Sequence, residues 1–101
     1  MNDYQEFVCR CASPRYTKEL AALGLAGEVG ELCDVIKKST IYPMIPRGRD
    51  EIVDEAGDVL WQLVNLLNQY GITLEEVMDH NISKLINRHK GERTAENGGE
   101  R

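Results

Sequence analysis

The sequence is poor in several residue types, and each shortage narrows the range of possible functions. Of its 101 residues, 6% are aromatic and only three are cysteines. The cysteines are odd in number and none forms a Cys-x-x-Cys pair, so we expect reduced thiols, a cytoplasmic location and neither a disulfide framework nor a zinc site. No apolar run approaches the roughly 18–20 residues of a membrane span. The first residues also lack the basic and apolar regions of a signal peptide.

Positive charge is scarce as well, with 12 Lys and Arg residues against 17 Asp and Glu residues and a formal net charge of −5. A protein that holds polymeric nucleic acid by its phosphates needs a basic face, so we expect no such partner and no membrane partner. The surplus of acids instead suits a site that gathers carboxylates around a divalent cation. The positions of the acids therefore become the main question.

Apolar residues recur at helical spacing, and no useful stretch alternates with the period of two that marks a strand. Pro43, Pro46 and Gly48 predict a loop over residues 40–49. A capping-box pattern begins at Thr73, and Gly71 is expected to end the helix before it. The expected helices cover residues 2–12, 16–39 and 50–70, with a fourth that starts at Thr73.

These elements predict an all-α protein, an antiparallel helix bundle formed by a single domain over residues 1–90. Residues 91–101 are polar and predict a flexible tail. The inward-facing residues are expected to be Leu20, Leu25, Val29, Leu32 and Ile36 in the first long helix, Ile52, Val59, Leu63, Leu66 and Leu67 in the second, and Leu74, Val77, Met78, Ile82, Leu85 and Ile86 in the last.

Each of the two long helices carries two acids three residues apart, Glu28 and Glu31 in one and Glu55 and Asp58 in the other. At about 100° per residue, both pairs lie on the same flank of the apolar stripe of their helix. They also lie at similar heights, about 10 Å and about 8 Å from the predicted loop. Antiparallel packing would therefore bring all four carboxylates to one level. An overlapping pair, Glu51 and Asp54, has the same spacing, but Asp54 projects further from the core.

Four converging acids repel one another and have raised pKa values unless a cation compensates them. Carboxylate oxygens of this kind suit Mg²⁺ or Mn²⁺. Gly27, Gly30 and Gly57 immediately precede three of the acids, either because a ligand approaches there or because helices pack closely there. A single acid pair is usually solvated surface charge, but two pairs at matching angle and height favour a metal site.

Three segments resemble the motifs of a known family. Gly27-Glu28-Val29-Gly30-Glu31-Leu32 and Glu55-Ala56-Gly57-Asp58-Val59-Leu60-Trp61 resemble the E-x-x-E…E-x-x-D signature of the MazG-like all-α nucleoside triphosphate pyrophosphohydrolases. Asn81-Ile82-Ser83-Lys84-Leu85-Ile86-Asn87-Arg88 resembles the N-x-x-K-L-x-x-R segment of that family. The resemblance covers roughly residues 20–90 and favours Glu55 and Asp58 as the second pair.

The resemblance implies hydrolysis of a nucleoside triphosphate between its α- and β-phosphates, with release of a nucleoside monophosphate and pyrophosphate. It implies Mg²⁺ held by Glu28, Glu31, Glu55 and Asp58, which also form the catalytic set. It further implies a homodimer or homotetramer in which the second copy completes both the bundle and the site.

Residues outside the acid pairs are candidates for binding the substrate. Lys84 and Arg88 share a helix face with Asn81 and could bind phosphate, as could Lys38. Trp61 could stack on a nucleobase. A solubilising face or a helix-dipole partner would also explain the basic residues, and burial in the core or a subunit interface would explain Trp61.

Several readings remain open at this point. A non-catalytic, dimeric helical regulatory or interaction module would not need the four acids or Mg²⁺. Within the enzyme class, phosphoribosyl-ATP pyrophosphohydrolases and the dimeric dUTPase relatives share the signature. A ferritin-like di-iron bundle would need E-x-x-H motifs, which this sequence lacks. Our hypothesis is a Mg²⁺-dependent pyrophosphohydrolase that acts on canonical or damaged (d)NTPs.

Overall fold

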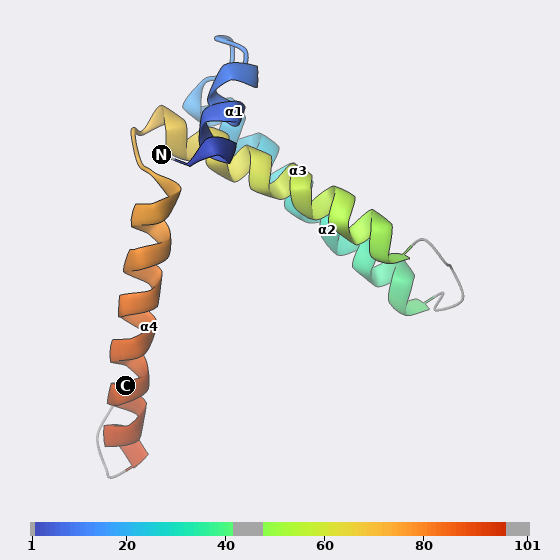
Figure 1. Ribbon diagram of the computed structural model, residues 1–101. Coiled ribbons are helices and arrows are strands. Elements are labelled where there is room, and N and C mark those ends of the chain that lie inside the picture. The colour runs from blue at the N-terminus through green and yellow to red at the C-terminus, as the bar shows by residue number, and fades with distance from the viewer. Residues whose placement is uncertain (1, 42–47, 97–101) are drawn as a thin grey trace.

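The computed structural model describes residues 2–41 and 48–96, and within them it contains four helices and no strand (Figure 1). The all-α prediction is therefore confirmed. The predicted loop lies mostly outside the described residues, but Thr40 and Gly48 at its edges are helical. None of the helices in the described part of the chain has the length and apolar character needed to cross a membrane. The helices are α1 (Asp3–Cys11), α2 (Lys18–Ile41), α3 (Gly48–Gln69) and α4 (Leu74–Glu96).

Helices α2 and α3 form an antiparallel pair, and α1 packs against α3 (Figure 1). Helix α4 leaves this pair at a wide angle and extends away from it, so the chain has an open, angular outline. The radius of gyration of the chain is 17.8 Å, whereas a compact domain of this length has a value of about 13 Å. The antiparallel pairing of the two long helices is therefore present within one chain, while the fourth helix lies apart from them.

The buried side chain of Gln5 ties α1 to the junction between α3 and α4. Its Nε2 donates to Asn68 Oδ1 and to the carbonyl oxygen of Ile72, both at 2.9 Å. Its Oε1 accepts a hydrogen bond of 2.9 Å from the backbone N–H of Leu74, the first residue of α4. A helix N-terminus leaves its first N–H groups without partners inside the helix, and Gln5 satisfies one of them. Helix α1 therefore holds the end of α3 and the start of α4 together.

Replacing Gln5 by Leu should lower the free energy of unfolding by about 3 kcal/mol, because the Leu side chain fills the space but leaves several polar groups without partners. Urea unfolding followed by circular dichroism measures the change. The matched control is Glu6→Leu at an exposed position of the same helix, which should change stability by no more than about 0.5 kcal/mol. Equal stabilities of the two variants would contradict the role assigned to Gln5.

The ends of α3 and α4 follow from local sequence. Gly71 has a φ of 66°, in the left-handed region that favours glycine, and it follows the last turn of α3 as predicted. The backbone N–H of Thr73 donates to Glu76 Oε2 at 2.9 Å, and the backbone N–H of Glu76 donates to Thr73 Oγ1 at 3.2 Å. This reciprocal pair is the predicted capping box. These boundaries need no information from distant parts of the chain.

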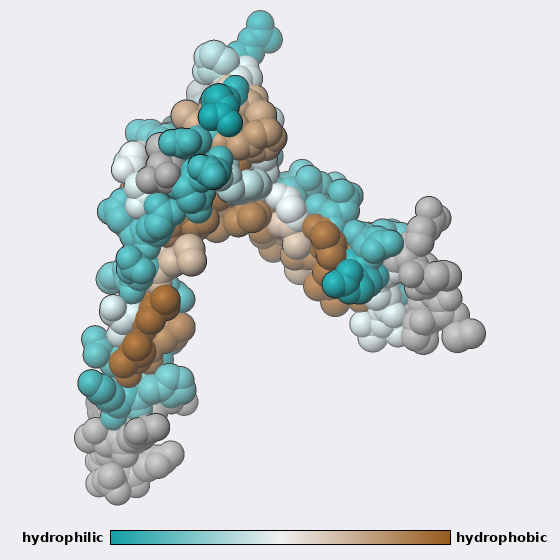
Figure 2. All heavy atoms as spheres, viewed as in Figure 1, coloured by the Kyte–Doolittle hydropathy of each residue, from teal (hydrophilic) through white to brown (hydrophobic). Residues whose placement is uncertain are grey.

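The buried core is much smaller than the core expected from the apolar stripes of the helices. This finding corrects the sequence-based prediction of inward-facing residues. Val8, Ala21 and Val64 are the fully buried apolar residues of the described chain. Figure 2 shows hydrophobic residues on the surface of both α4 and the α2–α3 pair. The reason is that, among the described residues, the extensive helix contacts are those of α3 with α2 and with α1, and α4 makes no comparable contact with another helix. Residues predicted to face inward but left between 38% and 54% exposed are Leu20, Val29, Ile36, Val77, Met78, Ile82, Leu85 and Ile86.

Helix α4 continues through Glu96, so residues 91–96 of the predicted tail are helical, and the flexibility of the tail stays a prediction. Glu and Arg residues in this stretch have good helix propensity, and extending an existing helix is far easier than starting one. Residues 97–101 lie outside the described part of the chain.

Candidate active site

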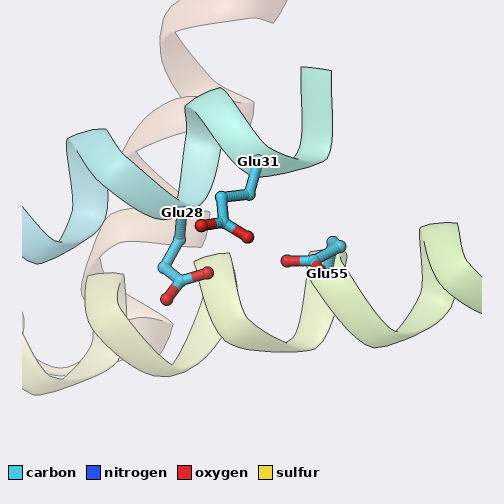
Figure 3. A group of neighbouring side chains, drawn as sticks. All are labelled: Glu28, Glu31 and Glu55. Atoms are coloured by element: carbon cyan, nitrogen blue, oxygen red, sulfur yellow. The ribbon is translucent and has the colours of Figure 1, made fainter. Parts of the chain in front are cut away.

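Three carboxylates from two helices meet on one side of the α2–α3 pair. Glu28 and Glu31 of α2 and Glu55 of α3 each offer an oxygen within 4.8 Å of the others. Figure 3 shows the two α2 side chains projecting toward α3, where Glu55 lies. The i, i+3 spacing places Glu28 and Glu31 on one helix face, and the antiparallel pairing brings Glu55 opposite them. Three of the four acids expected to converge therefore form one group in the structure, and the assignment of these residues as metal ligands stays a prediction.

Asp58 belongs to a second group, formed with Asp54 and Glu55, whose oxygens also lie within 4.8 Å of one another. Glu55 is common to both groups. The sequence reasoning missed Asp54 because it treated Glu51–Asp54 as a competing pair that projects away from the core. The available signal was the i, i+4 spacing of Asp54 and Asp58, which makes them neighbours on the surface of α3.

The two groups form a strongly acidic region in which the carboxylates repel one another. Burial raises the pKa of Glu55, and the charges of Glu31, Asp58, Glu28 and Asp54 raise it further. Burial also raises the pKa of Glu28, followed by the charges of Asp58 and Glu31. Glu55 Oε2 is buried and has no hydrogen-bond partner among the described residues. A buried carboxylate oxygen without a partner is unfavourable unless a cation or donor reaches it.

These residues fit a hard divalent cation. The donor set consists of carboxylate oxygens from two helices, which is the ligand type that Mg²⁺ and Mn²⁺ prefer. Glu28 and Glu55 are half-buried and Glu31 is exposed, so the group is open on one side to water or substrate oxygens. A bound cation would pair the orphaned Glu55 oxygen and offset the mutual repulsion of the acids.

The metal-free protein should lose stability as the pH rises through the titration range of these acids. The folded-state pKa values of Glu28 and Glu55 are raised, so their contribution to stability is fully present below the unfolded-state pKa and is lost as the pH rises through the folded-state pKa. Thermal unfolding in EDTA, from about pH 4 to about pH 7, measures this effect. The decline in melting temperature with pH should be smaller in the Glu28→Gln/Glu55→Gln variant. Identical pH profiles of the melting temperature for the variant and wild type would contradict this prediction.

The candidate phosphate-binding residues do not lie at the acids within one chain. Lys38 Nζ contacts Asp34 Oδ2 at 2.9 Å on the exposed side of α2, and this pair raises the pKa of Lys38 and lowers that of Asp34. Asn81, Lys84 and Arg88 are exposed on α4, which extends away from α2 and α3 (Figure 1). Their proposed roles therefore stay predictions that need a different neighbour for α4.

Aromatic residues of the segments around α3 bear on two further predictions. Trp61 packs edge-on against Tyr16 with ring centroids 5.8 Å apart, and its predicted stacking on a nucleobase stays a prediction. Burial raises the pKa of Tyr4, and the charge of Asp58 raises it further, which places α1 beside the acids of α3. The sequence reasoning had treated Tyr4 only as part of the apolar face of its helix.

Comparison with known proteins agrees with this geometry. Residues 16–92 match the profile of the MazG nucleotide pyrophosphohydrolase domain. The chain is 35% identical over 69 residues to the Gene 37 protein of Mycobacterium phage L5, an alignment that covers 65% of this chain and 60% of that protein. This chain thus spans less than two thirds of that relative. No solved structure matches significantly. Because the family profile covers most of the chain, including both acid pairs, this protein belongs to the MazG nucleotide pyrophosphohydrolase domain family.

Proposed function

We propose that the protein is a Mg²⁺-dependent pyrophosphohydrolase that cleaves a (d)NTP between its α- and β-phosphates. The observation that carries this proposal is the convergence of Glu28, Glu31 and Glu55 from two helices, in a chain of the MazG domain family. The unpaired, buried oxygen of Glu55 supports a cation at this place.

Glu28, Glu31, Glu55 and Asp58 would hold the Mg²⁺, and Mn²⁺ is an alternative. When bound, the cation supplies charge neutralisation to the triphosphate. In the reaction, water adds to phosphorus, the P–O bond between the α- and β-phosphates breaks, and its electron pair leaves with the departing phosphate group. A carboxylate of the acid group that is not engaged elsewhere accepts the proton of the attacking water. Lys84, Arg88 and Asn81 would bind phosphate oxygens.

The position of the cleaved bond gives the first test. Phosphorus NMR should detect a nucleoside monophosphate and pyrophosphate as the products. An analogue with a methylene group between the α- and β-phosphates should resist cleavage, whereas one with a methylene group between the β- and γ-phosphates should be cleaved. Release of a nucleoside diphosphate and inorganic phosphate would contradict the proposed reaction.

We further propose that two copies of the chain form a homodimer. A homotetramer would then consist of two such dimers. The accessible surface is 7735 Å², whereas a folded monomer of this mass exposes roughly 5,800 Å². An excess of roughly 2,000 Å² per chain matches what obligate homodimers bury. A Cβ atom added at Gly27, Gly30 or Gly57 would meet nothing within 4 Å, so the described chain leaves room beside the acids for another helix or a ligand.

A dimer would also give α4 a neighbour. Its exposed apolar residues could pack against the second copy, and Lys84 and Arg88 would then reach the acids of that copy rather than those of their own chain. A non-catalytic helical module could dimerise in the same way, but it predicts no response to Mg²⁺ and no pyrophosphate release.

A further inference from the structure

A hollow separate from the acid group lies where the end of α1 and the segment after it meet the C-terminal half of α3. It has a volume of about 330 Å³, near the lower limit for small-molecule sites. Its walls combine one aromatic ring with hydroxyl and carboxamide groups, and they contain no Lys or Arg. The residues that supply these groups are Ser13, Tyr16, Asn65, Asn68 and Gln69.

Asn65 gives this hollow a chemical preference. Its side chain is only 2% exposed, and its Nδ2 is buried without a hydrogen-bond partner among the described residues. The neighbouring carboxamide of Asn68 differs, because its Oδ1 accepts from Gln5 and its Nδ2 donates to the Gln5 carbonyl oxygen. An unpaired buried amide costs about 1–3 kcal/mol. Because Asn65 is one of the residues that line the hollow, a ligand that brings an acceptor to this amide would offset that cost.

The hollow is placed suitably relative to the acids. Asn65 follows Asp58 by seven residues, which is about 10 Å along α3 and nearly the same helix face. The ring of Tyr16, which is 37% exposed and backed edge-on by Trp61, forms a side wall. A nucleotide whose phosphates lie at the acids could therefore direct its base toward Tyr16 and Asn65.

We propose that this hollow is the nucleobase site of the enzyme and that Asn65 determines which bases it accepts. The proposal rests on the proposed nucleotide substrate and adds its mode of recognition. A carboxamide presents a donor beside an acceptor, which matches the paired donor and acceptor groups on the edge of a nucleobase. An aromatic wall supplies a stacking surface. A phosphate group fits poorly, because the hollow has no basic side chain and lies near the acids.

The test is a nucleoside titration followed by NMR of the side-chain amide groups in EDTA. The probes are adenosine, guanosine, cytidine, uridine and thymidine, which carry bases but no phosphate. The Asn65 signal, identified by its loss in Asn65→Leu, should shift saturably with at least one nucleoside and unequally across the set. Glu55→Gln should give the same shifts, because the acids do not contact the base. No shift with any nucleoside would overturn the proposal.

Variants separate base recognition from a structural effect. Asn65→Leu should melt at the same or a higher temperature than wild type, because it removes an unpaired buried amide, and it should lose nucleoside binding. Asn65→Asp replaces the amide donor by an acceptor and should also lose nucleoside binding. This second variant provides the test if Asn65→Leu does not fold. The control is Asn87→Leu at an exposed position of α4, which should bind nucleosides as wild type does. Unchanged binding in both Asn65 variants would overturn the proposal.

Kinetics distinguish failure of this inference from failure of the proposed function. In an active enzyme, Asn65→Leu should reduce the spread of kcat/KM among nucleotides about 10-fold or more. Activity with an unchanged base preference in Asn65→Leu would reject the base site but keep the enzyme. Nucleoside binding that depends on Asn65, in a protein that cleaves no nucleotide, would keep the site and reject the proposed reaction.

Discussion

Mixing two inactive variants should restore about a quarter of the wild-type pyrophosphohydrolase activity. One variant is Glu55→Gln, which damages the acid group, and the other is Lys84→Ala/Arg88→Ala, which removes the cations of α4. If each site takes its acids from one copy and its basic residues from the other, a mixed dimer contains one intact site and one doubly damaged site. Half of the dimers are mixed after random exchange, which gives about one quarter of the sites intact.

The expected result depends on the position of α4. Within one chain this helix extends away from α2 and α3, and Lys84 and Arg88 lie exposed on it (Figure 1). Each variant alone should lose at least about 100-fold in kcat/KM, because cations at the phosphates and acids at the metal act mainly on the transition state. The mixture is unfolded and refolded together to allow exchange, and wild type treated alike is the control. No gain over the separate variants would place acids and basic residues in the same copy.

The substitution of Glu55 by Gln should separate activity from stability. Gln keeps the shape of Glu but removes a charge from a place where burial and four other acids already raise the pKa of this carboxyl group. We therefore expect a higher melting temperature in EDTA at pH 7 and activity at least about 100-fold below wild type. Added Mg²⁺ should raise the melting temperature of wild type markedly and that of the variant very little.

The matched control for this experiment is Glu51→Gln, an exposed acid one turn earlier on α3 that belongs to neither carboxylate group. It should keep both its activity and its response to Mg²⁺. A Glu55→Gln protein that is less stable than wild type in EDTA would show that Glu55 serves the fold rather than a cation.

The features predicted correctly from sequence are those set by nearby residues. The capping box at Thr73 and Glu76 and the helix end at Gly71 each depend on contacts within a few positions. The meeting of Glu28, Glu31 and Glu55 needed only helical spacing and one assumption, the antiparallel pairing of two neighbouring helices. Such arguments use periodicity, which a single sequence displays directly.

The features that sequence reasoning missed depend on distant contacts or on their absence. The hydrogen bonds of Gln5 join it to residues that lie between 63 and 69 positions further along the chain, and no local sequence pattern predicts them. The apolar stripe of α4 predicted burial, but its residues are exposed in the described chain. Periodicity shows which face of a helix is apolar, and it does not show which element covers that face. The sequence does not predict the unpaired amide of Asn65, because Asn residues on helices are usually exposed to water. Only the positions of the neighbouring residues show that this amide is buried.

The most direct test of the central claim is a panel of the four NTPs and four dNTPs with Mg²⁺, assayed for pyrophosphate release by wild type and by Glu55→Gln in parallel. We predict that wild type releases pyrophosphate from at least one nucleotide, that EDTA abolishes the release, and that Glu55→Gln is at least about 100-fold slower. Release of no pyrophosphate from any nucleotide, or equal rates for the two proteins, would contradict the assignment of the acid group as a metal-dependent active site.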